Sequence, residues 1–118
     1  MKHIAIFDAA AESGKTLKEL GFNPTLYCAY RTSLDTGNDL IDFNEVIWDH
    51  DIKPIVDCLR SAGVTEFTIS STFSSLIETL AEFEKQGCRM QGLMQVKARY
   101  TDWRTGEQAI IPAIRMAL

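Results

Sequence analysis

The sequence predicts one α/β domain, with a mixed sheet built around a strand–helix–strand core at about residues 42–71. Three observations lead to this prediction. An apolar strand pattern at Thr65–Ser70 runs directly into an amphipathic helical pattern. Trp48–Ile69 forms a compact strand–helix–strand unit, which normally implies parallel strands. The chain then ends in a long alternating segment, a turn and a second extended segment, which predicts a C-terminal β-hairpin over residues 88–118.

The composition is that of an ordinary globular protein. With 118 residues the chain is long enough for one core and too short for two, so we expect a single domain over residues 1–118. Its 46% hydrophobic and 24% charged residues argue against a disordered or collagen-like chain. No apolar run approaches the roughly 20 residues that span a bilayer, and the first residues lack the pattern of an export signal. We expect a cytoplasmic protein without a membrane partner.

Few residue patterns in this chain are typical of catalysis. Cys28, Cys58 and Cys88 match no zinc spacing and no C-x-x-C motif, and their odd number favours reduced, packed thiols. The two histidines, His3 and His50, stand in no Ser/His/Asp or Cys/His pattern. We expect no cofactor, and the sequence favours a binding protein over an enzyme.

The charge is distributed unevenly along the chain. Residues 1–87 carry 7 Lys/Arg against 14 Asp/Glu, a net charge of −7, whereas residues 88–118 carry 5 against 2, a net charge of +3. A basic end on an acidic body permits electrostatic pairing with a protein partner or with a second copy. The basic residues are too few to predict nucleic-acid binding.

The first elements have two interpretations. His3–Phe7 fits a short strand, followed by a helix at about Gly14–Leu20 that ends before Pro24. Three alanines at residues 9–11 are strong helix formers, however, and they also permit one helix over residues 4–20.

Two further strands are predicted at Leu26–Thr32 and Leu40–Trp48. The residues between them include the turn formers Asp35, Gly37 and Asn38. Such a turn normally joins antiparallel neighbours, so the two strands are predicted to form a hairpin.

A helix is predicted to begin near Asp49–Asp51, where a carboxylate would cap its first turn. Pro54 is tolerated in that turn, and Gly63 marks the end of the helix. The helical spacing of four apolar side chains predicts the buried stripe Ile52, Ile55, Val56 and Leu59.

Thr65–Cys88 is the segment around which the other elements are predicted to assemble. After the strand come three hydroxyl residues that suit the open backbone donors of a helix start: Ser70, Ser71 and Thr72. Ser75 and Glu78 offer a second start, as a capping box. The helix is predicted over residues 72–86, with Gly87 as its stop. Its apolar face is Phe73, Leu76, Ile77, Leu80 and Phe83.

The last predicted elements are strands at Met90–Tyr100 and Ala109–Leu118, joined by a turn at Thr101–Gly106. Pro112 cannot donate a hydrogen bond to a neighbouring strand. Its position predicts that the final strand lies at an edge of the sheet or that the proline lies at a bulge.

Ser70, Ser71 and Thr72 are also candidate ligands for a small anion. They follow a strand at the start of a helix, where backbone donors and ligand sites of open α/β sheets occur. Helix capping alone requires the same residue types, so the pattern does not separate the two roles.

Asp49, His50 and Asp51 are weak candidates for a metal site, with Asp42 or Glu45 as a further ligand. Adjacent residues of an extended chain point in opposite directions, so the three side chains do not easily reach one ion. Capping of the following helix is the simpler interpretation.

The turn between the last two strands carries candidate partner-binding residues: Arg99, Tyr100, Trp103 and Arg104. Trp, Tyr and Arg dominate interface hot spots, because they bury much area at a small entropic cost. Lys97 and Arg115 would add a basic surround. The alternative is that Trp103 folds back over the sheet as a lid on the hairpin.

Two stretches resemble a group of small uncharacterised proteins from Gram-positive gut bacteria and their plasmids or phage-like elements. They are Thr65–Ser70 with Leu76–Glu78, and Arg99–Glu107 leading to Ile111–Ala113, and the similarity extends from about Leu40 to the end. No activity is known for that group. The resemblance implies a cytoplasmic bacterial accessory protein and assigns no catalytic residue.

The leading hypothesis is a non-enzymatic protein, expected to be a homodimer, that binds a protein partner through its C-terminal hairpin. The second hypothesis is a protein that binds or sequesters a nucleotide or phosphorylated metabolite at Ser70–Thr72. The third is a metal-dependent hydrolase or transferase that uses Asp49–Asp51.

Overall fold

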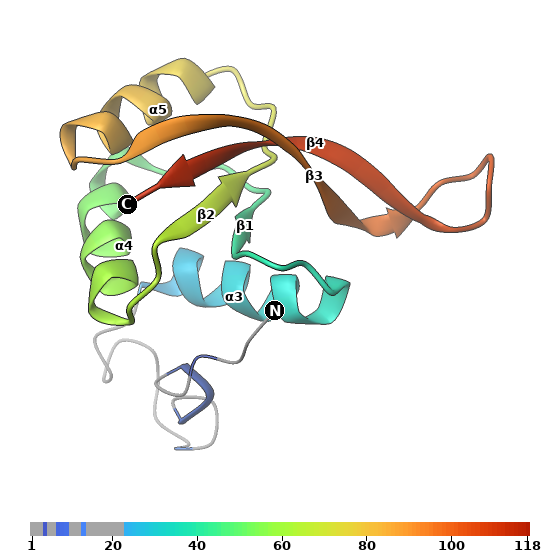
Figure 1. The fold of residues 1–118 in the computed structure, drawn as a ribbon, viewed down its shortest axis with the longest axis horizontal. Coiled ribbons are helices and arrows are strands. Elements are labelled where there is room, and N and C mark those ends of the chain that lie inside the picture. Colours follow the sequence, from blue (N-terminus) through green and yellow to red (C-terminus); the bar gives the residue numbers. More distant parts are fainter. Residues whose placement is uncertain (1–3, 5–6, 10–12, 14–22) are drawn as a thin grey trace.

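The computed structural model describes Ile4, residues 7–9, Ser13 and residues 23–118. Their strands form a four-stranded mixed sheet in the order β1-β2-β4-β3. β1 and β2 are parallel, whereas β4 is antiparallel to both of its neighbours (Figure 1). The predicted α/β fold is confirmed. The elements are α3 (Pro24–Thr36), β1 (Asp42–Phe43), α4 (Asp49–Ser61), β2 (Glu66–Ile69), α5 (Leu76–Lys85), β3 (Arg89–Thr101) and β4 (Gln108–Ala117).

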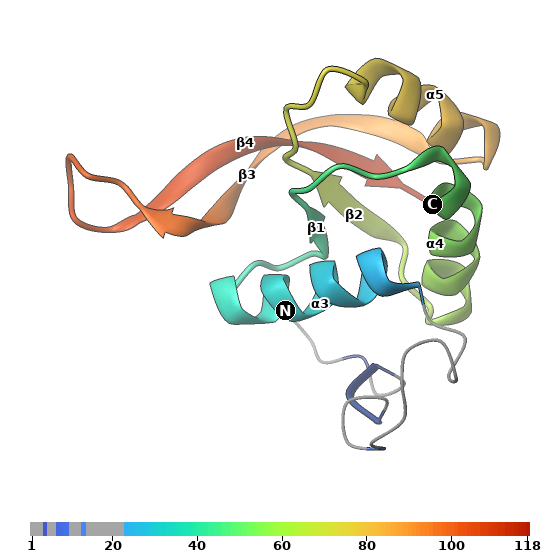
Figure 2. The same cartoon turned by 180° about the vertical axis from the view of Figure 1, so that it is seen from behind.

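The sheet lies between helices. α3 lies on one side of it and α5 on the other, with α4 beside α5 at one end (Figures 1 and 2). Neighbouring residues of a strand point to opposite faces of the sheet, so the side chains of β2 pack against the helices on both faces. The ring of Phe67 lies 5.2 Å from that of Phe83 in α5 and 5.6 Å from that of Phe43. Thr68 points to the α3 side.

The strand–helix–strand core forms as predicted. The stripe of α4 is buried at Ile52, Ile55, Val56 and Leu59. The backbone N–H of Ser70 donates to the carbonyl of Phe43, which continues the parallel pairing past the end of β2. The predicted capping is wrong, however. The N-cap of α4 is Trp48, which makes no side-chain capping bond, and Asp49 and Asp51 lie inside the first turn.

The predicted strand at Leu26–Thr32 is wrong, because these residues belong to helix α3. Asn23 and Pro24 begin this helix. The Asn23 side chain accepts a hydrogen bond from the N–H of Leu26, and Pro24 occupies the first turn, where its missing N–H costs nothing. The buried residues then follow a helical period: Leu26, Ala29, Tyr30 and Ser33.

The predicted hairpin of Leu26–Thr32 with Leu40–Trp48 is therefore wrong as well. Only Asp42 and Phe43 of the second segment form a strand, and they pair in parallel with Thr68 and Ile69 of β2. Gly37, which was expected in the hairpin turn, instead ends α3 at a φ of +79°.

The helix after β2 begins at the second of its two predicted starts, not at residue 72. α5 starts at Leu76 with Ser75 as its N-cap, although the Ser75 side chain makes no capping bond, and Ser70–Thr72 precede the helix. Gly87 follows its end at a φ of +88°, as predicted. Phe83 is fully buried, but Ile77 is 76% exposed, because the face that α5 turns to the sheet is narrower than its apolar pattern.

The C-terminal hairpin is confirmed as β3 and β4, but β4 is not an edge strand. Over Ile114–Ala117 it pairs with β2 on one side and β3 on the other. Pro112 lies beyond the reach of β2 and opposite Gln95 of β3, outside the irregular parts of the register. β4 tolerates the proline because only one neighbouring strand is present there.

Most of the predicted N-terminal elements, His3–Phe7 and Gly14–Leu20, lie outside the described residues. Residues 7–9 are helical, and the Phe7 ring packs edge-on against Tyr30 at 5.0 Å. None of the helices in the described part of the chain is long and apolar enough to cross a membrane.

The cysteines are free thiols in three environments. Cys88 is buried, Cys58 is half-buried and Cys28 is exposed, so the expectation of packed thiols is wrong for Cys28. Burial raises the pKa of the Cys58 and Cys88 thiols.

A buried carboxylate joins α3, β1 and β2. The hydroxyl groups of Thr68 and Ser70 donate to Oδ1 and Oδ2 of Asp42, both at 2.6 Å. The N–H of Asp42 donates to Oγ of Ser33, which in turn donates to the carbonyl of Ala29. Asp42 is only 5% exposed, so its charge depends on these donors.

We expect Asp42→Ala to lower the free energy of unfolding by about 2–4 kcal/mol, because it leaves two buried hydroxyl groups without an acceptor. Urea denaturation checks this. The triple variant that adds Thr68→Val and Ser70→Ala removes those groups and should recover part of the loss. Asp57→Ala, which breaks an exposed pair with Lys53, is the control. Equal effects of the two single substitutions would contradict the prediction.

Candidate functional site

Two adjacent cavities open where α3, the segment after β1 and the base of the β3–β4 hairpin meet. The outer cavity, of about 410 Å³, lies against the first half of α3 and is also lined by Asn44, Glu45 and Arg99. The inner cavity, of about 170 Å³, is lined by Ser70–Thr72 and Tyr100 and shares Asn44 and Arg99 with the outer one. The outer cavity lies at the carboxyl end of β1, and the inner cavity at the carboxyl ends of β1 and β2, where ligand sites of open α/β sheets occur.

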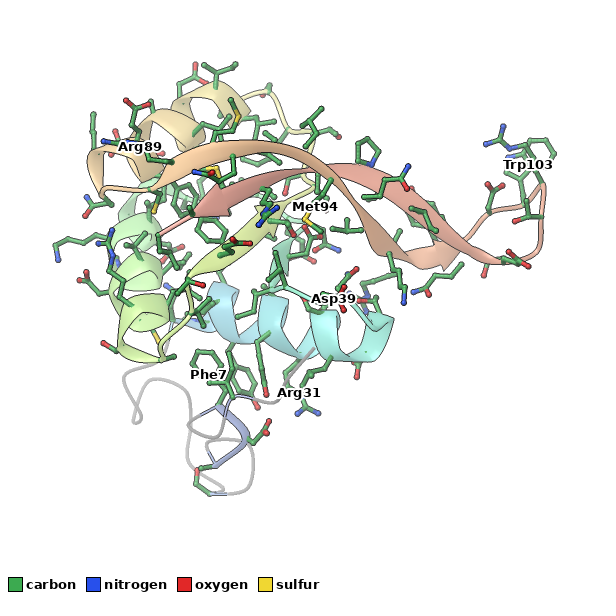
Figure 3. The ribbon with its side chains drawn as sticks, viewed as in Figure 1. Phe7, Arg31, Asp39, Arg89, Met94 and Trp103 are labelled. Atoms are coloured by element: carbon green, nitrogen blue, oxygen red, sulfur yellow. The ribbon has the colours of Figure 1, made fainter. Side chains whose placement is uncertain are left out.

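The outer cavity combines an apolar wall with charged side chains. Tyr27 supplies the aromatic part of the wall, whereas the Phe43 ring is buried against Phe67 in the core. Arg31 comes from α3 (Figure 3) and Arg99 from β3, two elements far apart in the sequence, and both residues are exposed. Glu45 adds one carboxylate. This set of groups is suited to binding an anion through two guanidinium groups.

Ser70, Ser71 and Thr72 line the inner cavity as a group. The Ser70 hydroxyl donates to Asp42 at 2.6 Å, and the Ser71 hydroxyl donates to the carbonyl of Glu45 at 2.8 Å. These two hydroxyl hydrogens therefore hold the segment after β1 in place. Thr72 is exposed. Anion binding by the three residues stays a prediction. In this structure the hydroxyl hydrogens of Ser70 and Ser71 are already donated within the chain, so they are not free to bind an anion.

The structure divides the predicted partner-binding residues between the two ends of the hairpin. Arg99 and Tyr100 line the inner cavity at the base. Trp103 lies at the tip of the hairpin, away from β1, β2 and the helices, and is 88% exposed, so the interpretation as a lid is wrong (Figure 3). The Arg104 guanidinium lies 6.0 Å from the centre of the Trp103 ring system. Asp102 accepts hydrogen bonds from the backbone N–H and from Nε of Arg104.

Asp49, His50 and Asp51 do not converge on one point. Asp51 accepts a hydrogen bond from the Asn23 side chain at 3.0 Å, and Nε2 of the exposed His50 lies 3.7 Å from Asp51 Oδ1. Asp42, considered as a further ligand, is buried in its hydroxyl network. Among the described residues, no three His, Cys, Asp or Glu side chains gather in a way that could hold a metal ion.

Asn38 is a positioning residue that sequence reasoning treated only as a turn former. Its side chain accepts from the N–H of Lys97 at 2.7 Å and donates to the carbonyl of the same residue at 2.9 Å. It thus binds the outer edge of β3 as a neighbouring strand would. Gln108 adds bonds to the carbonyls of Ala98 and Thr36. Together these contacts fix the base of the hairpin, and so the cavity wall, against the end of α3.

We expect Asn38→Leu to release this part of β3. Hydrogen exchange of the Lys97 amide should accelerate about tenfold relative to the Phe67 amide, the ratio that corresponds to one lost hydrogen bond of ~1.4 kcal/mol. NMR-detected exchange measures both amides in one sample. Asp35→Ala, an exposed change on α3, is the control and should leave the ratio unchanged. An unchanged ratio in Asn38→Leu would contradict the role of Asn38.

Comparison with known proteins identifies a family. No curated protein and no solved structure matches the chain. A protein family described as a domain of unknown function, DUF7698, matches residues 25–118, which include almost all of α3 and the whole sheet. The resemblance to uncharacterised proteins is thus confirmed, while an origin in Gram-positive gut bacteria or mobile elements stays a prediction. The chain belongs to the DUF7698 family.

Proposed function

We propose that this chain is a non-enzymatic accessory protein that binds a protein partner through the tip of its β3–β4 hairpin. One observation carries the proposal. The hairpin extends beyond the helices and the rest of the sheet, and it presents Trp103 at its end with 88% of the side chain exposed (Figures 1 and 3). Exposure of the large apolar surface of a tryptophan to water is unfavourable in free energy. Tryptophan is also among the residue types most enriched in interface hot spots.

The turn is organised in a way that favours binding. The Asp102 carboxylate accepts hydrogen bonds from the backbone N–H and from Nε of Arg104. The backbone N–H of Asp102 donates to the carbonyl of Glu107 at 2.7 Å. These hydrogen bonds fix the conformation of the turn in the unbound protein. A preorganised loop loses less conformational entropy on binding than a flexible one, so more of the contact energy of Trp103 remains as affinity.

The charge of the hairpin indicates the chemistry of the partner. Residues 88–118 carry a net charge of +3 (5 Lys/Arg, 2 Asp/Glu), whereas residues 1–87 carry −7 (7 Lys/Arg, 14 Asp/Glu). An acidic partner surface would be attracted to the hairpin and repelled by the body, which directs the encounter to this end of the molecule. A second copy of the chain meets the same requirement, through its acidic body.

The contacts of His50 and of Asp42 support a non-enzymatic role. His50, the histidine that the structure describes, is exposed at the start of α4 and has Asp51 as its ion-pair partner. The buried groups around Asp42 are occupied with one another. This arrangement favours a binding role over acid–base catalysis.

We expect the double variant Trp103→Ala/Arg104→Ala to lose the partner. Removal of a hot-spot pair worth at least ~2 kcal/mol weakens binding by a factor of ~30 or more. Affinity capture from native lysate, quantified against the wild type, measures this loss. Trp48→Ala is the matched control, since Trp48 is 63% exposed on the body, away from the hairpin. Capture of the same proteins in the same amounts by the wild type and the double variant would contradict the proposal.

Sedimentation velocity of the purified protein tests the homodimer version separately. If a second copy is the partner, the wild type and Trp48→Ala sediment as dimers and the double variant as a monomer. A dimer that persists in the double variant would place the self-contact elsewhere.

A further inference from the structure

The arginines of this chain divide into two groups by their contacts. Four of the six donate to an acceptor within the chain: Arg60, Arg89, Arg104 and Arg115. The side chains of Arg31 and Arg99 make no hydrogen bond or ion pair within the described part of the chain. Both line the outer cavity. The two arginines whose side chains lack a partner thus line one cavity, although they come from α3 and β3.

We propose that the outer cavity binds a small organic anion, with its carboxylate or phosphate group held by Arg31 and Arg99 and its ring against Tyr27. The volume of about 410 Å³ lies within the usual range of small-ligand sites, ~300–1,000 Å³. Guanidinium groups match carboxylate and phosphate oxygens in geometry and charge. The site does not involve the exposed tip of the hairpin.

The helix behind the cavity adds to the attraction for an anion. Pro24 and Thr25, at the start of α3, line the cavity. The N-terminal end of a helix carries a partial positive charge, which acts within about the first turn. This field and the two arginines act together, in a chain whose overall net charge is −4.

Glu45 restricts the ligand to one anionic group. Its exposed carboxylate lines the same cavity and leaves a balance of one positive charge among the three side chains. A nucleoside triphosphate would bring several negative charges close to this carboxylate, whereas a monophosphate or a carboxylate would not. The carboxylate also accepts a hydrogen bond from a hydroxyl or amino group of the ligand.

The position of Cys28 gives a readout at the cavity itself. Cys28 lines the outer cavity and is the exposed one of the three cysteines. Iodoacetamide, a neutral reagent, should therefore alkylate it in the folded protein before Cys58 and Cys88. A ligand in the cavity should slow the alkylation of Cys28.

The test is calorimetric titration of the full chain with phenyl phosphate, phenylacetate and adenosine monophosphate. Phenol, phenylacetamide and adenosine are the neutral counterparts, and inorganic phosphate carries no ring. We expect at least one of the three anions to bind and to protect Cys28 from iodoacetamide, and its neutral counterpart to do neither. The phosphate and carboxylate arms decide which head group is preferred. Adenosine triphosphate should bind more weakly than the monophosphate.

Charge-removing variants locate the site. Arg31→Gln and Arg99→Gln should each weaken binding by a factor of ~10–100, the value of one charge-assisted hydrogen bond, and should abolish the protection of Cys28. Arg104→Gln, an arginine of the same hairpin outside the cavity, is the matched control and should bind as the wild type. Circular dichroism verifies the fold of each variant. Trp103→Ala/Arg104→Ala should also retain the anion, which separates this site from partner binding.

Three results would overturn the proposal. The first is the absence of binding by every anion at millimolar concentration. The second is equal affinity of the wild type and Arg99→Gln. The third is equal affinity for inorganic phosphate and for phenyl phosphate, which would remove the role assigned to Tyr27.

Discussion

The structure depends on one buried carboxylate. Asp42 lies in β1, and its carboxylate accepts hydrogen bonds from the hydroxyl groups of Thr68 in β2 and of Ser70 just after it. The N–H of Asp42 donates to Ser33 of α3. A two-residue strand supplies few backbone bonds of its own. The carboxylate therefore fixes the short parallel pair and the helix against each other, and it sets the carboxyl edge of the sheet where both cavities open.

The hairpin combines a fixed base with a projecting end. At the base, the Asn38 side chain completes the edge of β3 at Lys97, and Gln108 binds the end of α3. These contacts place Arg99 beside the cavities. Beyond them, β3 and β4 pair only with each other, and the turn presents Trp103 (Figure 1). One element therefore serves two proposed roles, at positions that separate substitutions can test.

Sequence reasoning succeeded where one pattern decided the structure locally. The buried stripe of α4, the apolar strand at Phe67 and the long alternating strands of the hairpin each have one period that fits. It failed at Leu26–Thr32, because Asn23 and Pro24 end one element as readily as they begin another. It failed again in assigning Ser70 and Ser71 to helix capping. A short hydroxyl group can donate to any acceptor within reach, and here the acceptors are Asp42 and the carbonyl of Glu45. The clamp of Asn38 on Lys97 left no sequence signal, because the two residues are 59 positions apart.

The sequence by itself determined the α/β class, the parallel core unit, the C-terminal hairpin and the uneven charge. These follow from residue periods and composition, which act over short stretches of chain. Only the tertiary structure decided that α3 is a helix on the face of Thr68, that Trp103 is exposed, and that Arg31 and Arg99 line one cavity. Those facts depend on which distant segments pack together. Packing of this kind is set by the whole core, and no local pattern encodes it.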